Sequence, residues 1–191
     1  MNRGGRAPQL LLHSIAMPAG LGRRLVAYAV DCAVLFGGLL VLQAIVYPLN
    51  PIVRTLRDDG AVSGGNLHLW VFATATVPFL VYFVSAVASR RQSTVGMALL
   101  RMRVEMVDGG RVSLPRALLR STVLLVPFEV NHMLMFHFAP PTGEAPSAAF
   151  WIGIAAVWVL IGVFLASVLV SPRRQSLHDR VAGTVVMGPS R

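Results

Sequence analysis

Three ionisable side chains lie inside long apolar stretches of this 191-residue sequence, where a charge is costly. Arg24 and Asp31 stand seven residues apart in the first apolar stretch, and Arg120 stands at the start of the third. A charge at the centre of a bilayer costs roughly 2.5–3.5 kcal/mol on insertion scales, so each group needs a partner. Helical spacing puts Arg24 and Asp31 on one face. We therefore expect Asp31 to pair with Arg120, while Arg24 holds the membrane interface.

A second polar set lies near the middle of the third apolar stretch. Glu129 and His132 are three residues apart, so a helix places them on one face. A carboxyl group beside an imidazole can exchange a proton with it, which would suit proton or cation coupling. The alternative is a pair that only hydrogen-bonds to itself and fixes helix packing.

The same stretch also contains residue types that bind soft metals. Met133 and His137 share one helical face, as do His132 and Met135, and copper(I) accepts such ligands. Methionine in an apolar helix usually only fills space, so we predict no metal site and no cofactor. Cys32 is the only cysteine, which excludes an intrachain disulfide and a cysteine zinc site.

The elements that must position these groups are long apolar helices. Hydrophobic residues make up 55% of the chain and charged residues only 13%, which excludes an ordinary soluble domain. About 20 apolar residues cross a bilayer as a helix. The sequence therefore predicts an all-α membrane protein with four transmembrane helices, at about residues 24–47, 67–88, 117–138 and 149–170.

The distribution of arginine predicts the orientation. The chain has no lysine, so its net charge of +9 comes from arginine, which is concentrated in residues 1–19, 89–116 and 171–191. Arginine-rich loops stay in the cytoplasm, which places both termini there. We expect a multi-pass protein of the bacterial inner (plasma) membrane with the lipid bilayer as its partner. Nucleic acid is excluded as a partner, because the arginines separate apolar runs instead of forming one soluble face.

The chain divides into one membrane domain and two tails. We expect a flexible cytoplasmic tail at 1–19, the membrane domain at 20–187 and a short C-terminal tail at 188–191. Within the central cytoplasmic loop, Asp108-Gly109 between partly alternating residues predicts a β-hairpin or a tight turn.

The C-terminal segment brings another acid back to the membrane surface among arginines. We expect Asp179 to form a salt bridge with Arg23 or Arg24 and so tie this segment to the start of the first helix. His178 and Asp179 together could suggest a catalytic dyad. No nucleophile or metal partner accompanies them, so we predict no enzyme.

Five short motifs follow one another along the chain between Gly20 and Met187. They are Arg24 and Ala27 with Asp31, Gln92 to Met97, Arg103-Val104 with Asp108-Gly109, Leu119-Arg120, and Leu177-His178-Asp179 with Ala182-Gly183-Thr184. In this order they resemble the signature of the RDD family of small bacterial membrane proteins. The resemblance implies that the arginine and two aspartates for which the family is named are Arg24, Asp31 and Asp179. It also implies transport of unidentified ligands. Met97 departs from the lysine that often occupies this position.

Two functions are compatible with this sequence. The first is a small transporter or proton-coupled ion exchanger for a small cation or proton, whose ligand or ion site is built from Arg24, Asp31, Arg120, Glu129 and His132. The second is a scaffold or accessory subunit in which the same charges only fix helix packing. Four helices are few for enclosing a pathway, so we expect a homo-oligomer, with Gly162 and Ala166 on one candidate surface.

Overall fold

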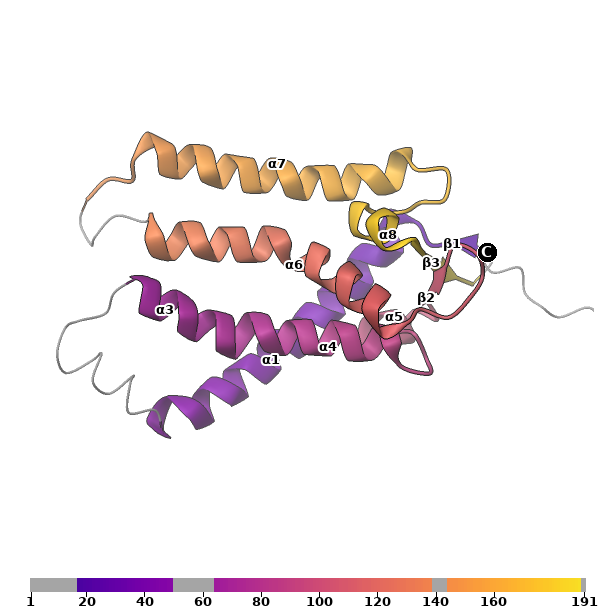
Figure 1. The fold of residues 1–191 in the computed structure, drawn as a ribbon, viewed down its shortest axis with the longest axis horizontal. Coiled ribbons are helices and arrows are strands. Elements are labelled where there is room, and N and C mark those ends of the chain that lie inside the picture. The colour runs from indigo at the N-terminus through magenta and orange to yellow at the C-terminus, as the bar shows by residue number, and fades with distance from the viewer. Residues whose placement is uncertain (1–16, 50–63, 139–143, 190–191) are drawn as a thin grey trace, which may run out of the picture.

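The computed structural model describes residues 17–49, 64–138 and 144–189. Residues 1–16 of the predicted N-terminal tail lie outside the described residues, as do parts of the two loops, at 50–63 and 139–143. Helices make up most of the described chain, and a small sheet lies at one end of them (Figure 1).

Four helical rods form the body of the protein, and two short helices lie at one end. The rods are α1 (Leu21–Leu49), α3 (Gly64–Val71) continued by the π-helical turn η1 (Phe72–Thr76) and α4 (Val77–Ala88), α6 (Leu114–His137) and α7 (Ala148–Val170). The short helices are α5 (Val95–Leu99) and α8 (Leu177–Ala182).

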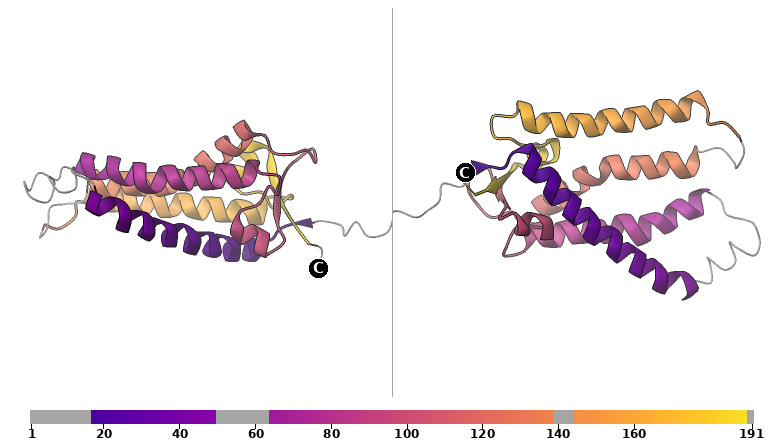
Figure 2. Two further views of the ribbon diagram at one scale, coloured as in Figure 1. Left: turned by 90° about the horizontal axis from the view of Figure 1, so that it is seen from below. Right: turned by 180° about the vertical axis from the view of Figure 1, so that it is seen from behind.

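Helix α6 occupies the middle of the arrangement. It packs against α3 and α4 on one side and against α7 on the other, while α1 crosses obliquely behind (Figure 1 and Figure 2). Its N-terminal half also contacts α8. A polar side chain on α6 can therefore meet partners from several other helices.

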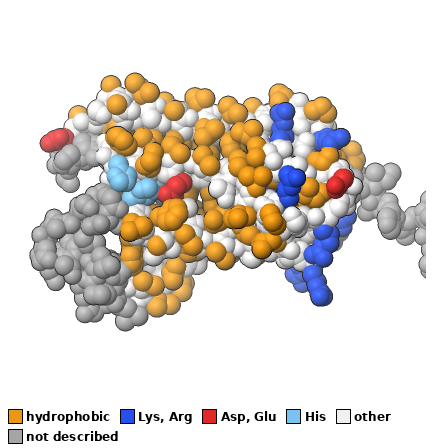
Figure 3. Space-filling view, viewed as in Figure 1, with side chains coloured by type: hydrophobic (Ala, Val, Ile, Leu, Met, Phe, Trp, Pro, Cys, Tyr) orange, Lys and Arg blue, Asp and Glu red, His pale blue; other side chains and the backbone are white. Residues whose placement is uncertain are grey.

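Three of the rods have the length and composition of membrane spans. They cover Leu21–Val46, Leu67–Ala88 and Ala148–Val170, and apolar side chains cover much of the surface between the two ends (Figure 3). The predicted spans at 24–47, 67–88 and 149–170 thus correspond to apolar helices. The predicted span at 117–138 corresponds to α6, which is not among the three and carries Arg116, Arg120 and Glu129.

The second rod changes its winding before Pro78. In η1 the N–H of Val77 donates to the carbonyl of Phe72, five residues back. Proline has no N–H and its ring crowds the preceding turn, so the regular helical ladder is interrupted at this point. Such π-turns often occur at functional sites. This one ends at Thr76, whose hydroxyl faces α6.

The small sheet joins three distant parts of the chain. Strands β1 (Met17–Pro18) and β2 (Arg103–Met106) both pair antiparallel with β3 (Thr184–Gly188), in the order β1-β3-β2. Met17 lies opposite Gly188, so the two ends of the described chain lie side by side at one end of the bundle (Figure 1).

The tight turn predicted at Asp108-Gly109 is present, because the N–H of Gly109 donates to the carbonyl of Met106. The turn is closed hairpin-like by a second bond, from the N–H of Met106 to the carbonyl of Gly110 at 3.0 Å, but no second strand follows it and the ladder partner of β2 is β3. The residues after the turn lead directly into α6, whereas β3 offers a buried apolar strand. The segment predicted as a flexible tail at 1–19 contains a strand near its end, since Met17–Pro18 form β1.

A tightly packed core lies where the sheet meets the helices. Its buried members are Ala19, Ala27, Val87, Met97, Met102, Val104, Val112, Ala117 and Val186. Helix α5 enters this core against α1, and it can do so only because residue 96 is glycine. A Cβ on Gly96 would lie 2.0 Å from the carbonyl oxygen of Ala27.

We predict that Gly96→Ala destabilises the protein by at least about 2 kcal/mol, because the clash is with backbone and α5 must shift away from α1. Gly38→Ala is the control, because a Cβ there meets nothing within 4 Å. Denaturant unfolding in detergent, followed by circular dichroism, measures both variants. Equal stabilities would contradict this close packing.

Candidate functional site

A buried carboxylate on α8 forms the centre of one polar cluster. Helix α8 starts at Ser176, whose N–H donates to Asp179 Oδ2 at 3.2 Å, and ends at Gly183 with a positive φ of 67°. These short-range signals make a six-residue helix that presents Asp179 inward. Asp179 is fully buried.

Two guanidinium groups from different rods bind this carboxylate. Arg24 on α1 donates from Nη1 to Asp179 Oδ2 at 2.6 Å, and Arg120 on α6 donates from Nε to Oδ1 at 2.9 Å. Both arginines are buried. The predicted salt bridge between Asp179 and Arg24 is therefore confirmed. The predicted pair of Asp31 with Arg120 is wrong, because α8 folds back beneath the rods and brings a different acid to Arg120.

Arg24 also holds two stretches of backbone. Its Nε donates to the carbonyl of Ala19 at 3.1 Å, and its Nη2 donates to the carbonyl of Arg174 at 2.7 Å. One side chain thus joins α1 to the segment after β1 and to the α7–α8 loop. With three of its donors bonded in this way, Arg24 functions as a structural clamp.

His178 lies beside this cluster and is buried. Burial lowers the pKa of His178 to about 3; the negative charge of Asp179 opposes this shift, and the guanidiniums of Arg120 and Arg24 add to it. The ring is therefore neutral, and its Nε2 lies 3.2 Å from Arg120 Nη2, which can only donate. Burial alone would raise the pKa of Asp179, but the guanidiniums of Arg120 and Arg24 hold it well below its usual range.

Asp31 serves a separate part of the structure. Its carboxylate accepts hydrogen bonds from Thr94 Oγ1 at 2.6 Å, Tyr82 Oη at 2.7 Å and the N–H of Gly96 at 2.8 Å. Asp31 is almost fully buried. It therefore holds the start of α5 against α1 and α4. The sequence contained a signal for this role: Thr94 is a helix N-cap, and the unpaired N–H groups of a helix start attract a carboxylate.

A second polar cluster lies towards the opposite end of the bundle, where Figure 3 shows histidine beside a carboxylate at the surface. Glu129 Oε1 lies 2.7 Å from His68 Nε2, and Thr76 donates to Glu129 Oε2 at 2.6 Å. His68 Nδ1 in turn lies 2.9 Å from His137 Nε2. Glu129 and His68 are partly buried, and His137 is exposed.

His68 is the site residue that the sequence reasoning missed. It is the only charged or histidine side chain in the span Leu67–Ala88, which is itself a signal of a polar role. It takes the position expected for His132, whose Nδ1 lies 3.9 Å from Glu129 Oε2, beyond hydrogen-bonding distance. The ring of His132 packs instead on Phe128, with ring centroids 4.1 Å apart.

Within the residues that the structure describes, no group of three or more histidine, cysteine, aspartate or glutamate side chains could hold a metal ion. The copper ligands considered on α6 do not gather either, because His137 turns towards His68 and His132 towards Phe128.

Comparison with known families identifies the chain. The model of the RDD family matches residues 18–183, which is most of the sequence. The chain belongs to the RDD family. Comparison with curated proteins and with solved structures gives no match.

The three residues inferred to carry the RDD signature belong to two separate clusters of contacts. Arg24 and Asp179 form one ion pair, whereas Asp31 anchors α5. The signature residues thus make two attachments to α1 at the sheet end of the bundle: one holds α8 and the other holds α5. Neither attachment leaves a carboxylate oxygen without a donor.

We predict that Asp179→Asn costs about 3–5 kcal/mol of stability, because two buried guanidiniums lose their counter-charge. Accumulation in the membrane and thermal unfolding in detergent measure the loss. Asp108→Asn is the matched control on an exposed turn. If Asp179→Asn were as stable as this control, the ion pairs would not hold α8 in place.

The neutral state of His178 predicts a pH dependence. The unfolded chain protonates His178 near its ordinary pKa of 6.5, whereas the folded chain does so only near 3. Between these values the unfolded state binds more protons, so stability falls as pH is lowered, by up to about 1.4 kcal/mol per pH unit.

His178→Gln isolates this contribution from that of the other histidines. Denaturant unfolding measured from neutral pH down to pH about 4 should show a shallower pH dependence in this variant, by roughly one bound proton. An unchanged slope would mean that His178 is already charged in the folded protein.

Proposed function

We propose that this protein is a proton-coupled ion exchanger of the inner membrane. In this proposal residues 20–187 form a membrane domain with four transmembrane helices, and both termini lie in the cytoplasm. Helix α6 is the fourth span: its 24 residues extend about 36 Å, enough to cross the hydrocarbon core. The arginine-rich segments at the sheet end support the cytoplasmic assignment for that end.

The observation that carries the proposal is the chain of hydrogen bonds from Glu129 through His68 to His137. His137 is eight residues beyond Glu129 on α6, so the chain covers about 12 Å along the helix axis. Its far end is exposed at the end of the bundle away from the sheet. A proton can thus move between the outer surface and a carboxylate inside the bundle.

The proton transfer leaves Glu129 as a carboxylate and His68 neutral, and His137 is positively charged until it passes the proton to water. Glu129 gives its proton to His68 Nε2, and the proton on His68 Nδ1 passes to His137 Nε2. The imidazole has two nitrogens and can bridge a donor and an acceptor in this way. When Glu129 has lost its proton, its carboxylate is the group that a small cation would neutralise, with Thr76 as a neighbouring oxygen.

The buried cluster at the sheet end has a different role in this proposal. Arg24, Asp31 and Arg120 were candidates for the ion site, but their contacts support a structural role, since they join the rods to α5 and α8. These contacts are also the observation that favours the second function, a scaffold or accessory subunit without transport.

The proposal includes a homo-oligomer and no catalytic reaction. Gly162 on α7 is exposed, and a Cβ there would meet nothing within 4 Å. This surface is therefore open to the α7 helix of a second copy.

Proton flux in reconstituted vesicles with a pH gradient tests the proposal. We predict that Glu129→Gln abolishes cation-dependent proton flux, because glutamine cannot release a proton, while the protein still inserts and accumulates. Glu105→Gln on strand β2 is the matched control and should keep wild-type flux. His137→Gln should slow the flux without abolishing it, since His68 remains in contact with Glu129.

Asp31→Asn separates the packing role of Asp31 from transport, and the flux of the wild-type protein distinguishes the two functions. In the exchanger described here the substitution lowers accumulation of the protein, because Asp31 anchors α5, but the flux per folded molecule is retained. If the wild-type protein carries no flux against any cation tested, with or without the gradient, the exchanger is excluded and the scaffold remains.

A further inference from the structure

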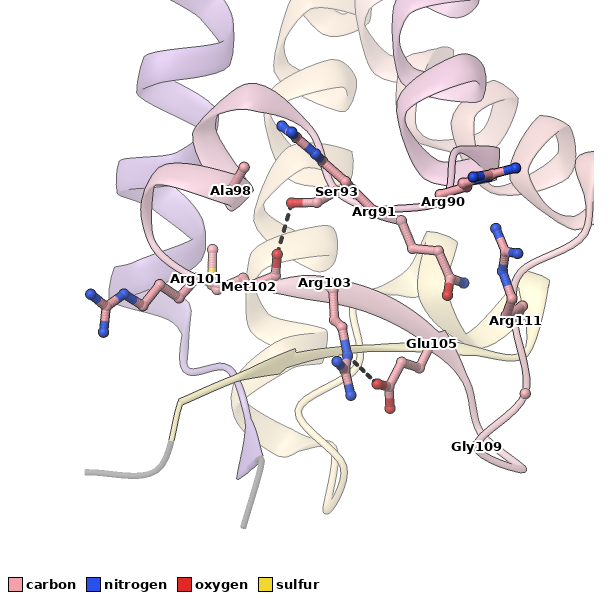
Figure 4. A pocket seen from close by; sticks show the side chains of 12 residues that line it. Arg90, Arg91, Ser93, Ala98, Arg101, Met102, Arg103, Glu105, Gly109 and Arg111 are labelled. Carbon is pink, nitrogen blue, oxygen red and sulfur yellow. Dashed lines mark hydrogen bonds and ion pairs between the residues drawn. The ribbon is translucent and has the colours of Figure 1, made fainter. Parts of the chain in front are cut away.

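A basic pocket lies beside the sheet, beyond the C-terminal end of α4, and has a volume of about 540 Å³ (Figure 4). Two segments form its walls: the link from α4 to α5 and the stretch around β2 with the turn after it. Five arginines and one carboxylate line it: Arg90, Arg91, Arg101, Arg103, Arg111 and Glu105.

The two walls are fixed to each other by hydrogen bonds to backbone carbonyls. The N–H of Val104 donates to the carbonyl of Gln92 at 2.8 Å, and Ser93 Oγ donates to the carbonyl of Met102, also at 2.8 Å. The hydroxyl contact is visible in Figure 4. The pocket is thus a preformed part of the fold rather than a chance gathering of surface side chains.

Two residues of the walls have a strained backbone. Gln92 and Arg101 both adopt a left-handed conformation, with φ of 50° and 53°, that non-glycine residues rarely occupy. Such conformations persist where the surrounding structure enforces them, and they are common at ligand sites. Both residues line the pocket.

The amide of Gln92 lacks a partner. Its side chain is 8% exposed and lines the pocket, and its Nε2 finds no acceptor in the part of the chain that the structure describes. A buried donor without an acceptor is costly, so a ligand oxygen at this point would be stabilised.

Several of the arginines also have unused donors. Within the described residues, the guanidiniums of Arg90 and Arg91 donate to no other group, whereas Arg103 pairs with Glu105 and Arg111 donates to the carbonyl of Ser89 at 3.2 Å. Figure 4 shows Arg90 and Arg111 extending towards each other on one side of the pocket. Guanidinium groups bind phosphate oxygens through paired N–H bonds.

We propose that this pocket binds a phosphate group. The arginines supply charge and paired donors, and Gln92 supplies a neutral donor from the buried wall. The pocket lies at the end of a helix that spans the membrane in the function proposed above, level with the lipid headgroups. The phosphate therefore comes from an anionic phospholipid or from a soluble phosphate compound. The proposal does not depend on the proton exchange at Glu129.

The test compares two pairs of arginines in the purified full-length protein. Arg90→Gln with Arg91→Gln removes two exposed charges from the pocket. Arg173→Gln with Arg180→Gln removes two exposed charges at the same end of the molecule but outside the pocket. In one arm, inorganic phosphate and pyrophosphate are titrated in detergent. In the other, native mass spectrometry counts phosphatidylglycerol retained in preference to phosphatidylcholine.

We expect the pocket pair to weaken phosphate binding by about tenfold or more, because charge-assisted hydrogen bonds are lost, and the outer pair to leave it within about twofold. Loss in the soluble arm identifies a soluble phosphate compound as the ligand, and loss in the phospholipid arm alone identifies the lipid headgroup. Gln92→Leu, which changes no charge, should also weaken binding, by roughly threefold to tenfold.

Two results would overturn the proposal. If both arginine pairs weaken binding equally and Gln92→Leu has no effect, the arginines act only through the general positive charge of this end. If neither phosphate nor phosphatidylglycerol binds the wild-type protein more tightly than phosphatidylcholine does, the pocket is not a phosphate site. Glu129→Gln should leave binding unchanged, which separates this result from the outcome of the flux experiment.

Discussion

The structure depends on one buried carboxylate held between two guanidinium groups. Asp179 receives Arg24 from α1 and Arg120 from α6, and all three side chains are almost fully buried. A buried charge is tolerated only when it is paired and hydrogen-bonded, so substitution of any one of the three leaves a buried charge without a partner. This constraint places α8 against the rods, and with α8 it places β3, around which the small sheet forms.

A second buried carboxylate, Asp31, attaches α5 to α1 through hydrogen bonds. Asp31 accepts three hydrogen bonds from α5 and from the end of α4, and Gly96 allows α5 to approach the backbone of α1 closely. Together the two attachments make the sheet end of the molecule rigid. The basic pocket is built on that rigid end, since its walls include the link from α4 to α5 and strand β2.

The opposite end of the bundle is organised differently. Glu129, His68 and His137 are partly or fully exposed, and they form a linear chain rather than a closed cluster. In the proposed exchanger this chain carries the proton, whereas the buried charges at the sheet end hold α5 and α8 against the rods. This difference is why we assign exchange to Glu129 and packing to the RDD signature residues.

The sequence by itself determined the apolar helices at 24–47, 67–88 and 149–170, the turn at Asp108-Gly109 and the RDD family. These follow from local hydropathy, turn chemistry and ordered motifs, none of which needs a three-dimensional partner. It also predicted that Asp179 pairs with Arg23 or Arg24, because an acid between arginines at the membrane surface must find a counter-charge near the helix start, and the structure selects Arg24.

Only the tertiary structure decided which groups meet over long range. Asp31 and Arg120 have opposite charges, and their positions in the apolar stretches place them at similar depths in the membrane. In the structure, however, Arg120 binds Asp179 on α8, and Asp31 accepts hydrogen bonds at the start of α5. Likewise His68 displaces His132 from Glu129, because the packing of α3 on α6 brings it within 2.7 Å. Helical spacing fixes neighbours on one helix, whereas partners on different helices depend on how those helices pack.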